Sequence, residues 1–183
     1  MSASLPTLTL ILGGIRSGKS ERAEALVRGS GLPVVYLATA RPLDGEMRAR
    51  IARHRARRDP AWRLVEAPLD LADALAGAAG AGRVVLVDGL GVWLANLLVE
   101  LGGEADVRTR LVAFREALLR AAGPVVVVSE EVGLAPVPAD SLTRRFADLL
   151  GDLNRWIAGR AQRVELVVAG LSLVLRGPRD SFE

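Results

Sequence analysis

One short segment combines glycine, lysine and serine at the spacing of a phosphate-binding loop. It fits the pattern G-x-x-x-x-G-K-[ST] in full, with the residues Gly13, Gly14, Ile15, Arg16, Ser17, Gly18, Lys19 and Ser20. Glycines let the backbone turn tightly and aim successive N–H groups at phosphate oxygens. We expect the Lys19 ammonium to act as a catalytic group on the β- and γ-phosphates, and the Ser20 hydroxyl to hold Mg²⁺. The alternative is a glycine-rich turn with an incidental lysine, but Lys19 is the only lysine among 24 basic residues.

A second oxygen ligand for magnesium is expected from a carboxylate at the end of a neighbouring buried strand. The apolar run at 84–87 ends in Asp88 and supplies such a carboxylate. Taken alone, an aspartate in this position can also be the N-cap of the next helix. Combined with the phosphate loop, Asp88 is predicted to share the magnesium ion with Ser20.

His54, the one histidine, lies in a segment with six arginines between positions 48 and 58. On a helix, Met47, Ile51 and His54 share one face. One reading places the histidine at the edge of an apolar stripe inside a solvated basic helix. The other makes it a nucleophile, because clustered cations disfavour protonation of an imidazole and the neutral form can attack phosphorus. The nearby guanidinium groups would then form a second phosphate-binding site.

A nucleic-acid-binding helix is a rival reading of the same arginines, since arginine also pairs with the phosphate backbone. Aromatic residues for base stacking are scarce nearby, and only Trp62 follows closely. The formal net charge is only +3, which is weak support for such a partner. We therefore expect no nucleic-acid partner.

Short apolar runs alternate with helix-like stretches along the chain. Strands are predicted at 8–12, 34–39, 62–65, 83–87, 124–128 and 164–169, with an edge strand at 171–175. Helices are predicted at 17–28, 44–58 (with Asp44 as N-cap), 69–79, 92–101, 107–122 and 141–158. Buried strands separated by helices predict an α/β fold, a mostly parallel sheet flanked by helices, in one domain over 1–183 with a polar tail from about 177.

The sheet would bring several polar residues to one edge. In an open parallel sheet, ligands bind beyond the carboxyl ends of the strands. Asp88, Glu131 and Thr39 are therefore expected to face one crevice together with the phosphate loop. The proline- and glycine-rich stretch at 131–138 is predicted to be a loop near the ligand.

Composition excludes several classes of protein. Half of the 183 residues are hydrophobic, enough for a sizeable core, and the absence of cysteine excludes disulfides and cysteine-ligated metal sites. No run of about 18 apolar residues is present, so no membrane span is expected. The first residues do not resemble a secretory signal, and a cytoplasmic location is expected.

Further motifs make the chain similar to a known family. They are Tyr36-Leu37-Ala38-Thr39-Ala40, Glu46-Met47, Arg50-Ile51, His54-Arg55, Trp62, Glu66, Asp88-Gly89-Leu90, Trp93-Leu94, Asn96-Leu97-Leu98, Glu131-Val132-Gly133, Val137-Pro138, Arg145-Phe146, Asp148, Gly151 and Asn154. In this order and spacing, from about Leu8 to Arg176, the chain resembles the bifunctional adenosylcobinamide kinase / adenosylcobinamide-phosphate guanylyltransferases of cobalamin biosynthesis.

The resemblance implies two reactions. ATP or GTP phosphorylates adenosylcobinamide, and GTP then donates GMP to the resulting phosphate through a guanylyl-histidine at the position of His54. It also implies a RecA-like P-loop fold, a homotrimer and Mg²⁺ as the cofactor. The family's nucleotide contacts map onto the phosphate loop (13–20) and onto Thr39, Ala40, Arg55, Ala56, Arg57, Arg58, Glu66 and Asp88.

The chain departs from the family pattern at five positions. Family members usually have Cys and Thr at Gly89 and Gly91, Asn and Gln at Glu130 and Arg155, and Gly at Ala135. Three alternatives stay open: another small-molecule P-loop kinase, a nucleic-acid-binding P-loop ATPase and a non-catalytic nucleotide-binding module. The kinase would form no covalent GMP adduct, and the ATPase would bind nucleic acid in a salt-dependent way.

Overall fold

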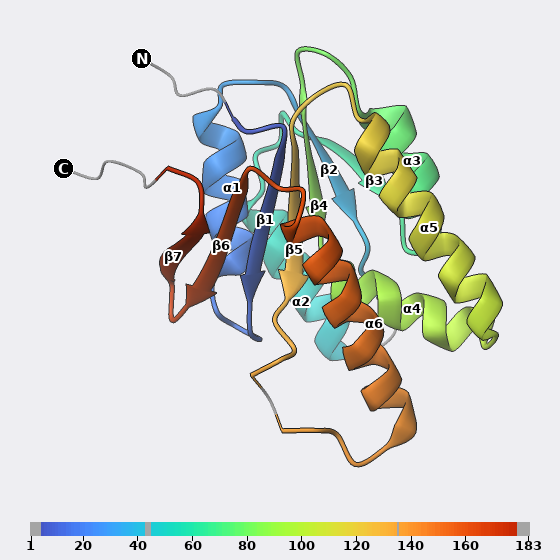
Figure 1. Ribbon diagram of the computed structural model, residues 1–183. Helices are drawn as coiled ribbons and strands as arrows, with labels where there is room; N and C mark the ends of the chain where they lie inside the picture. Colours follow the sequence, from blue (N-terminus) through green and yellow to red (C-terminus); the bar gives the residue numbers. More distant parts are fainter. Residues whose placement is uncertain (1–4, 43–44, 135, 179–183) are drawn as a thin grey trace.

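The computed structural model describes residues 5–42, 45–134 and 136–178. Seven strands form one sheet in the order β3-β2-β4-β5-β1-β6-β7 (Figure 1). Neighbouring strands run parallel except β7, which pairs antiparallel with β6 at the edge. The strands are β1 (Leu8–Gly13), β2 (Val34–Ala38), β3 (Arg63–Glu66), β4 (Val84–Asp88), β5 (Val125–Glu130), β6 (Arg163–Val168) and β7 (Leu171–Arg176).

Helices cover both faces of this sheet, as the apolar strands predict. They are α1 (Lys19–Gly29), α2 (Gly45–Arg57), α3 (Leu71–Ala78), α4 (Leu90–Leu101), α5 (Glu104–Arg120) and α6 (Ser141–Ala158). One apolar core joins the sheet to α3, α4, α5 and α6, and Trp93 and Phe114 are its largest aromatic residues. A smaller core on the other face packs Ala23 and Val27 of α1 against Ile11, Leu86 and Val126.

The predicted fold class and elements are confirmed, with small differences at the ends of helices and strands; the strands predicted at 62–65 and 124–128 lie at 63–66 and 125–130. Helix α5 begins at Glu104, three residues before the predicted start, because two acidic residues, Glu104 and Asp106, occupy its first turn and favour the helix start. The prediction placed this start at the first apolar residue, Val107. Helix α4 begins at Leu90 rather than at 92. The predicted N-cap Asp44 lies outside the described residues.

The topology brings the candidate site together at one edge of the sheet. Strands β1, β2, β4 and β5 are parallel neighbours, so their carboxyl ends meet at the same edge. These ends carry Gly13, Ala38, Asp88 and Glu130. Residues far apart in the chain therefore surround the phosphate loop, which follows β1.

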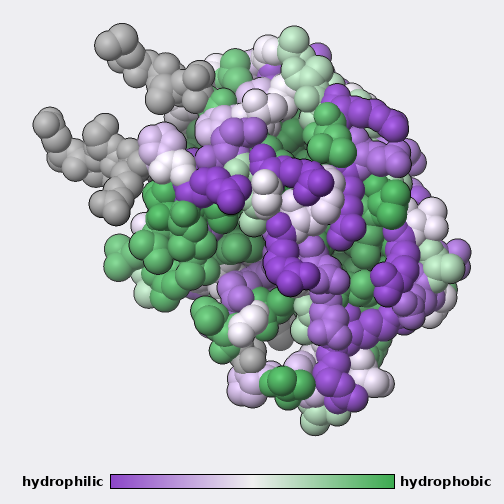
Figure 2. All heavy atoms as spheres, in the orientation of Figure 1, coloured by the Kyte–Doolittle hydropathy of each residue, from purple (hydrophilic) through white to green (hydrophobic). Residues whose placement is uncertain are grey.

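At one lateral edge of the sheet, beyond β6, lies the apolar strand β7. In β7, Leu171, Leu173 and Leu175 are exposed, and Val168 of β6 is exposed beside them. Figure 2 shows apolar surface on this side of the molecule. Within the described part of the chain, no helix is both long and apolar enough to cross a bilayer.

Candidate active site

The phosphate loop has the backbone that its glycines predict. Gly18 is the N-cap of α1 with φ 94°, a left-handed conformation that favours glycine. A Cβ at Gly13 would overlap Ser17 and lie 2.7 Å from the Val167 carbonyl oxygen, so only glycine fits there. Gly14, Ile15 and Arg16 are exposed, whereas Lys19 and Ser20 open α1 and are buried. The positive end of α1 therefore faces the loop, as an anion site requires.

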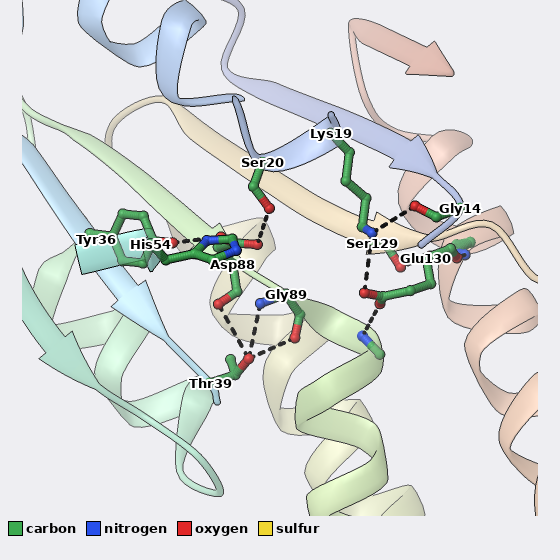
Figure 3. Close-up of polar contacts among 12 residues, drawn as sticks. Gly14, Lys19, Ser20, Tyr36, Thr39, His54, Asp88, Gly89, Ser129 and Glu130 are labelled. Carbon is green, nitrogen blue, oxygen red and sulfur yellow. Dashed lines mark hydrogen bonds and ion pairs between the residues drawn. The ribbon is translucent and has the colours of Figure 1, made fainter. Parts of the chain in front are cut away.

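Lys19 lies at the floor of this site. Its Nζ donates a hydrogen bond to the Gly14 carbonyl at 3.1 Å and lies 3.5 Å from Glu130 Oε1 (Figure 3). The other carboxylate oxygen of Glu130 accepts a hydrogen bond from the Gly91 N–H, at the start of α4. The lysine charge is thus balanced by a residue at the end of β5.

Asp88 joins three other side chains of the site. Its Oδ1 accepts a hydrogen bond from the Ser20 hydroxyl at 3.1 Å. Its Oδ2 accepts one from the Tyr36 hydroxyl at 2.5 Å and lies 3.8 Å from His54 Nδ1 (Figure 3). Burial, together with the Asp88 charge, raises the pKa of Tyr36, so its hydroxyl remains a donor.

The residues present fit a magnesium ion. Ser20 Oγ and Asp88 Oδ1 are hard oxygen donors next to the phosphate loop, and Mg²⁺ commonly uses one or two protein ligands together with substrate phosphates. Among the described residues, no cluster of three or more His, Asp or Glu side chains would form an all-protein metal cage. The donor set thus suits an ion that arrives with a nucleotide.

His54 faces the site instead of the solvent. It lies on α2, its side chain is 23% exposed, and it borders two cavities. The first, of about 290 Å³, is also lined by Lys19, Tyr36, Asp88 and Glu130. The second, of about 690 Å³, lies between the phosphate loop and α2. An imidazole between these cavities has the position that a nucleophile needs.

Four arginines of α2 and Arg58, the residue after this helix, lie around the same two cavities; the four are Arg48, Arg53, Arg55 and Arg57. Arg55 donates to Glu66 at 2.8 Å, Arg57 pairs with Glu21, and the Arg58 guanidinium lies 3.7 Å from the centre of the Tyr36 ring. Arg55 and Arg58 line the first cavity, and Arg57 lines the second together with Ala56. The helix therefore carries a cationic surface toward the phosphate loop.

The remaining predicted nucleotide contacts lie at the first cavity. Thr39, Ala40 and Glu66 all line it. The Thr39 hydroxyl forms two hydrogen bonds with the backbone of Gly89: it donates to the carbonyl at 2.8 Å and accepts from the N–H at 2.9 Å. Thr39 thereby holds the turn that follows Asp88.

The prediction that Glu131 faces the crevice is wrong. Glu131 caps its own loop by accepting hydrogen bonds from the Gly133 and Leu134 N–H groups, and Glu130 occupies the crevice in its place. Alternation along β5 carries the signal that could have found this. Val126 and Val128 face α1, and Glu130 has the same parity, so it points toward Lys19.

Sequence reasoning also missed the role of Tyr36, which was noted only as part of a motif. Two departures from the family pattern, Gly91 and Glu130, are in contact through the hydrogen bond between them. A Cβ at position 91 would overlap Glu130 Oε2. The observed position of the Glu130 carboxylate therefore requires a residue without a Cβ at position 91.

Comparisons of the sequence with known proteins identify one family and several relatives. A family model described as "Cobinamide kinase / cobinamide phosphate guanyltransferase" matches residues 9–175. A bifunctional adenosylcobalamin biosynthesis protein of Pseudomonas aeruginosa is 51% identical over 92% of this chain and 96% of its own. One of Escherichia coli is 35% identical over 92% and 99%.

Solved structures show the same fold at low identity. The flagellar accessory protein FlaH from Methanocaldococcus jannaschii has a TM-score of 0.52 at 13% identity, covering 94% of this chain and 80% of its own. An ATPase of a bacterial type III secretion system has a TM-score of 0.57 at 13% identity, covering 93% and 57%. Both likenesses agree with a P-loop nucleotide-binding fold.

Proposed function

The chain belongs to the cobinamide kinase / cobinamide phosphate guanyltransferase family, and from this premise we propose that it phosphorylates adenosylcobinamide with ATP or GTP. It then transfers GMP from GTP to adenosylcobinamide phosphate, which yields adenosyl-GDP-cobinamide and pyrophosphate. The observation that carries this proposal is the convergence on Asp88. One of its oxygens accepts from Ser20 of the phosphate loop, and the other lies 3.8 Å from His54 Nδ1.

The backbone N–H groups of 14–19, together with Lys19, would hold the triphosphate. Ser20 and Asp88 would hold Mg²⁺, which neutralises phosphate charge when bound. The side chains and backbone at the first cavity and on α2 would contact the rest of the nucleotide: Thr39, Ala40, Arg55, Ala56, Arg57, Arg58 and Glu66.

For guanylyl transfer, His54 is the nucleophile. A carboxylate beside Nδ1 favours a proton on that nitrogen, which leaves the lone pair on Nε2 for attack on the α-phosphorus. The new N–P bond forms as the bond to pyrophosphate breaks, and pyrophosphate leaves. A phosphate oxygen of adenosylcobinamide phosphate then attacks the same phosphorus and releases neutral His54. Splitting one transfer between two anions into two steps makes each step easier.

Charged side chains stabilise both transition states of this route. Asp88 offsets the positive charge that develops on the imidazole ring, and the arginines of α2 offset the negative charge on the equatorial oxygens. In the kinase step, positioning and electrostatics dominate and the protein does little covalent chemistry. Lys19 is needed for both reactions, whereas His54 is needed only for guanylyl transfer.

A labelling experiment tests this assignment. The protein is incubated with GTP labelled on the α-phosphate, denatured and assayed for a bound label that is acid-labile and alkali-stable. The wild type should carry the label, and His54→Asn should not, although it still phosphorylates adenosylcobinamide. Lys19→Ala should lose both activities, by about 100-fold or more. Arg120→Ala, on the exposed side of α5, is the matched control and should label normally.

The outcomes separate the parts of the proposal. A wild type without adduct would rule out the covalent route. Equal labelling of His54→Asn would show that another residue is the nucleophile.

The trimeric assembly proposed for the chain follows from the family resemblance, and the proposed location follows from the sequence expectations given above. We propose a homotrimer of single-domain chains (residues 1–183) that works in the cytoplasm, where nucleoside triphosphates are supplied. The continuous seven-stranded sheet supports a single domain. The exposed leucines of β7 support association, because a second chain could cover them.

A further inference from the structure

Glu130 places a carboxylate beside the lysine on which the proposed nucleotide site depends. Its Oε1 lies 3.5 Å from Lys19 Nζ, and the two side chains are 20% and 6% exposed. Removing a buried ammonium from water is costly unless a counter-ion balances its charge. In this structure Glu130 provides that charge.

The position of this carboxylate is built into the fold. Its second oxygen accepts a hydrogen bond from the Gly91 N–H at 2.9 Å, in the first turn of α4. The N-cap of α4 is Gly89, which has no side chain to cap the helix, so Glu130 takes over this role from the neighbouring strand. A Cβ at Gly91 would overlap Glu130 Oε2. Glycine is a poor helix former, and its presence at 91 leaves room for the carboxylate.

A nucleotide brings negative charge to the same ammonium. The lysine of a phosphate loop reaches the β- and γ-phosphates, so these groups and Glu130 are alternative partners for Lys19. Two negative groups within a few ångströms of each other repel, and they do so more strongly in a partly buried site than in water. Binding of the triphosphate must therefore overcome an ion pair that already exists.

We propose that Glu130 competes with the terminal phosphates for Lys19 and so sets the affinity of the site for nucleoside triphosphates. The inference rests on the nucleotide site of the proposed function and adds a residue that tunes it. Glu130 weakens binding of the β- and γ-phosphates and leaves binding of a nucleoside monophosphate almost unchanged. When the β- and γ-phosphates leave the site, the ion pair forms again.

The test removes the charge and keeps the shape. Glu130→Gln retains an oxygen that can accept from the Gly91 N–H. Dissociation constants are measured for a non-hydrolysable GTP analogue and for GMP, with magnesium present. The variant should bind the GTP analogue about 5- to 150-fold more tightly than the wild type, the range of a typical coupling free energy between two sites. Its affinity for GMP should change by less than about twofold.

Matched variants control for the site and for general charge effects. Glu131→Gln removes the adjacent carboxylate, which caps its own loop, and should bind the analogue like the wild type. Lys19→Ala should no longer bind the GTP analogue. If the wild type itself fails to bind the analogue, the proposed function fails. If the wild type binds and Glu130→Gln binds equally or more weakly, only the competition is wrong. Unchanged binding with slower phosphorylation would also overturn it.

A second pair of variants tests where the carboxylate lies. In the wild-type background, Gly91→Ala forces the flexible end of the Glu130 side chain away from the Gly91 N–H, because the new Cβ would overlap Oε2. The preference of helices for alanine over glycine acts in both backgrounds. In the Glu130→Asn background the shorter side chain clears the space, so Gly91→Ala should change the melting temperature more favourably there than in the wild type. The same change in both backgrounds would contradict the placement of Glu130.

Discussion

Asp88 links the two halves of the candidate active site. One oxygen accepts from Ser20, on the side of the phosphate loop, and the other accepts from Tyr36 and lies near His54. Tyr36 in turn supports the C-terminal end of α2, because the guanidinium of Arg58, the residue after this helix, lies over its ring. A single carboxylate thus couples the position of the nucleophile to that of the phosphates.

The Tyr36 hydroxyl is expected to contribute to stability. In Tyr36→Phe, the ring contacts with Trp62 and Arg58 remain, but Asp88 loses a charged hydrogen bond. Such a bond is worth about 1.5–3 kcal/mol, and urea denaturation should show a loss of this size. No change in the unfolding free energy would mean that this hydrogen bond is weak in solution.

At this scale the sequence predicts what is local. Lys19, Ser20 and Asp88 are recognised by spacing and by the end of a strand, and the structure brings them together. Tyr36 and Glu130 escape such reasoning, because their roles depend on which strands are neighbours and on the side of the strand that each residue faces. The incorrect prediction of Glu131 in place of Glu130 is an example: successive side chains of a strand point to opposite faces of the sheet, so an error of one residue selects the wrong face.

Among the elements, α1 is held to the sheet by a buried ionic network. Glu165 of β6 is fully buried and accepts hydrogen bonds from Arg22 Nε at 2.7 Å and Arg22 Nη2 at 3.0 Å. Arg163 and Ser172 donate to the same carboxylate. Since α1 begins at Lys19, this network fixes the helix whose first turn forms the anion site.

The network predicts a pH dependence of stability. Burial alone would raise the pKa of Glu165, but hydrogen bonds from Arg22, Ser172 and Arg163 outweigh it and lower the pKa below its ordinary value of 4.5. A lowered pKa stabilises the fold above pH 4.5, and this contribution is lost as the pH falls through the folded-state value.

Glu165→Gln should therefore lower stability near neutral pH by about 3 kcal/mol, the usual effect of breaking a buried pair. Its unfolding free energy should also decline less steeply than that of the wild type below pH 4.5. Denaturation curves at several pH values test both points. Parallel pH profiles for the two proteins would show that Glu165 does not titrate as described.

For the whole molecule, the order of the strands decides which residues meet. The sequence predicts seven strands and a mostly parallel sheet, but not that β5 lies between β1 and β4. The apolar runs at 84–87 and 125–128 are nearly interchangeable in composition, so either fits a central position. Long-range packing makes the choice, and only this choice places Glu130 between Lys19 and α4.

The proposed homotrimer is a prediction at this scale. Light scattering on the purified protein should give three times the 19.4 kDa mass of the chain. Burying the exposed leucines of β7 would favour such association. A mass that corresponds to one chain at micromolar concentration would contradict it.

The single lysine has a practical consequence. Amine-directed reagents such as acylating agents find one side-chain amine in this chain, and it lies at the floor of the cavity, paired with Glu130 and the Gly14 carbonyl. Acylation located at Lys19, as distinct from the α-amino group of the chain, therefore reports on the occupancy of the active site. Ligand entry can thus be followed through the reactivity of Lys19, without an engineered label.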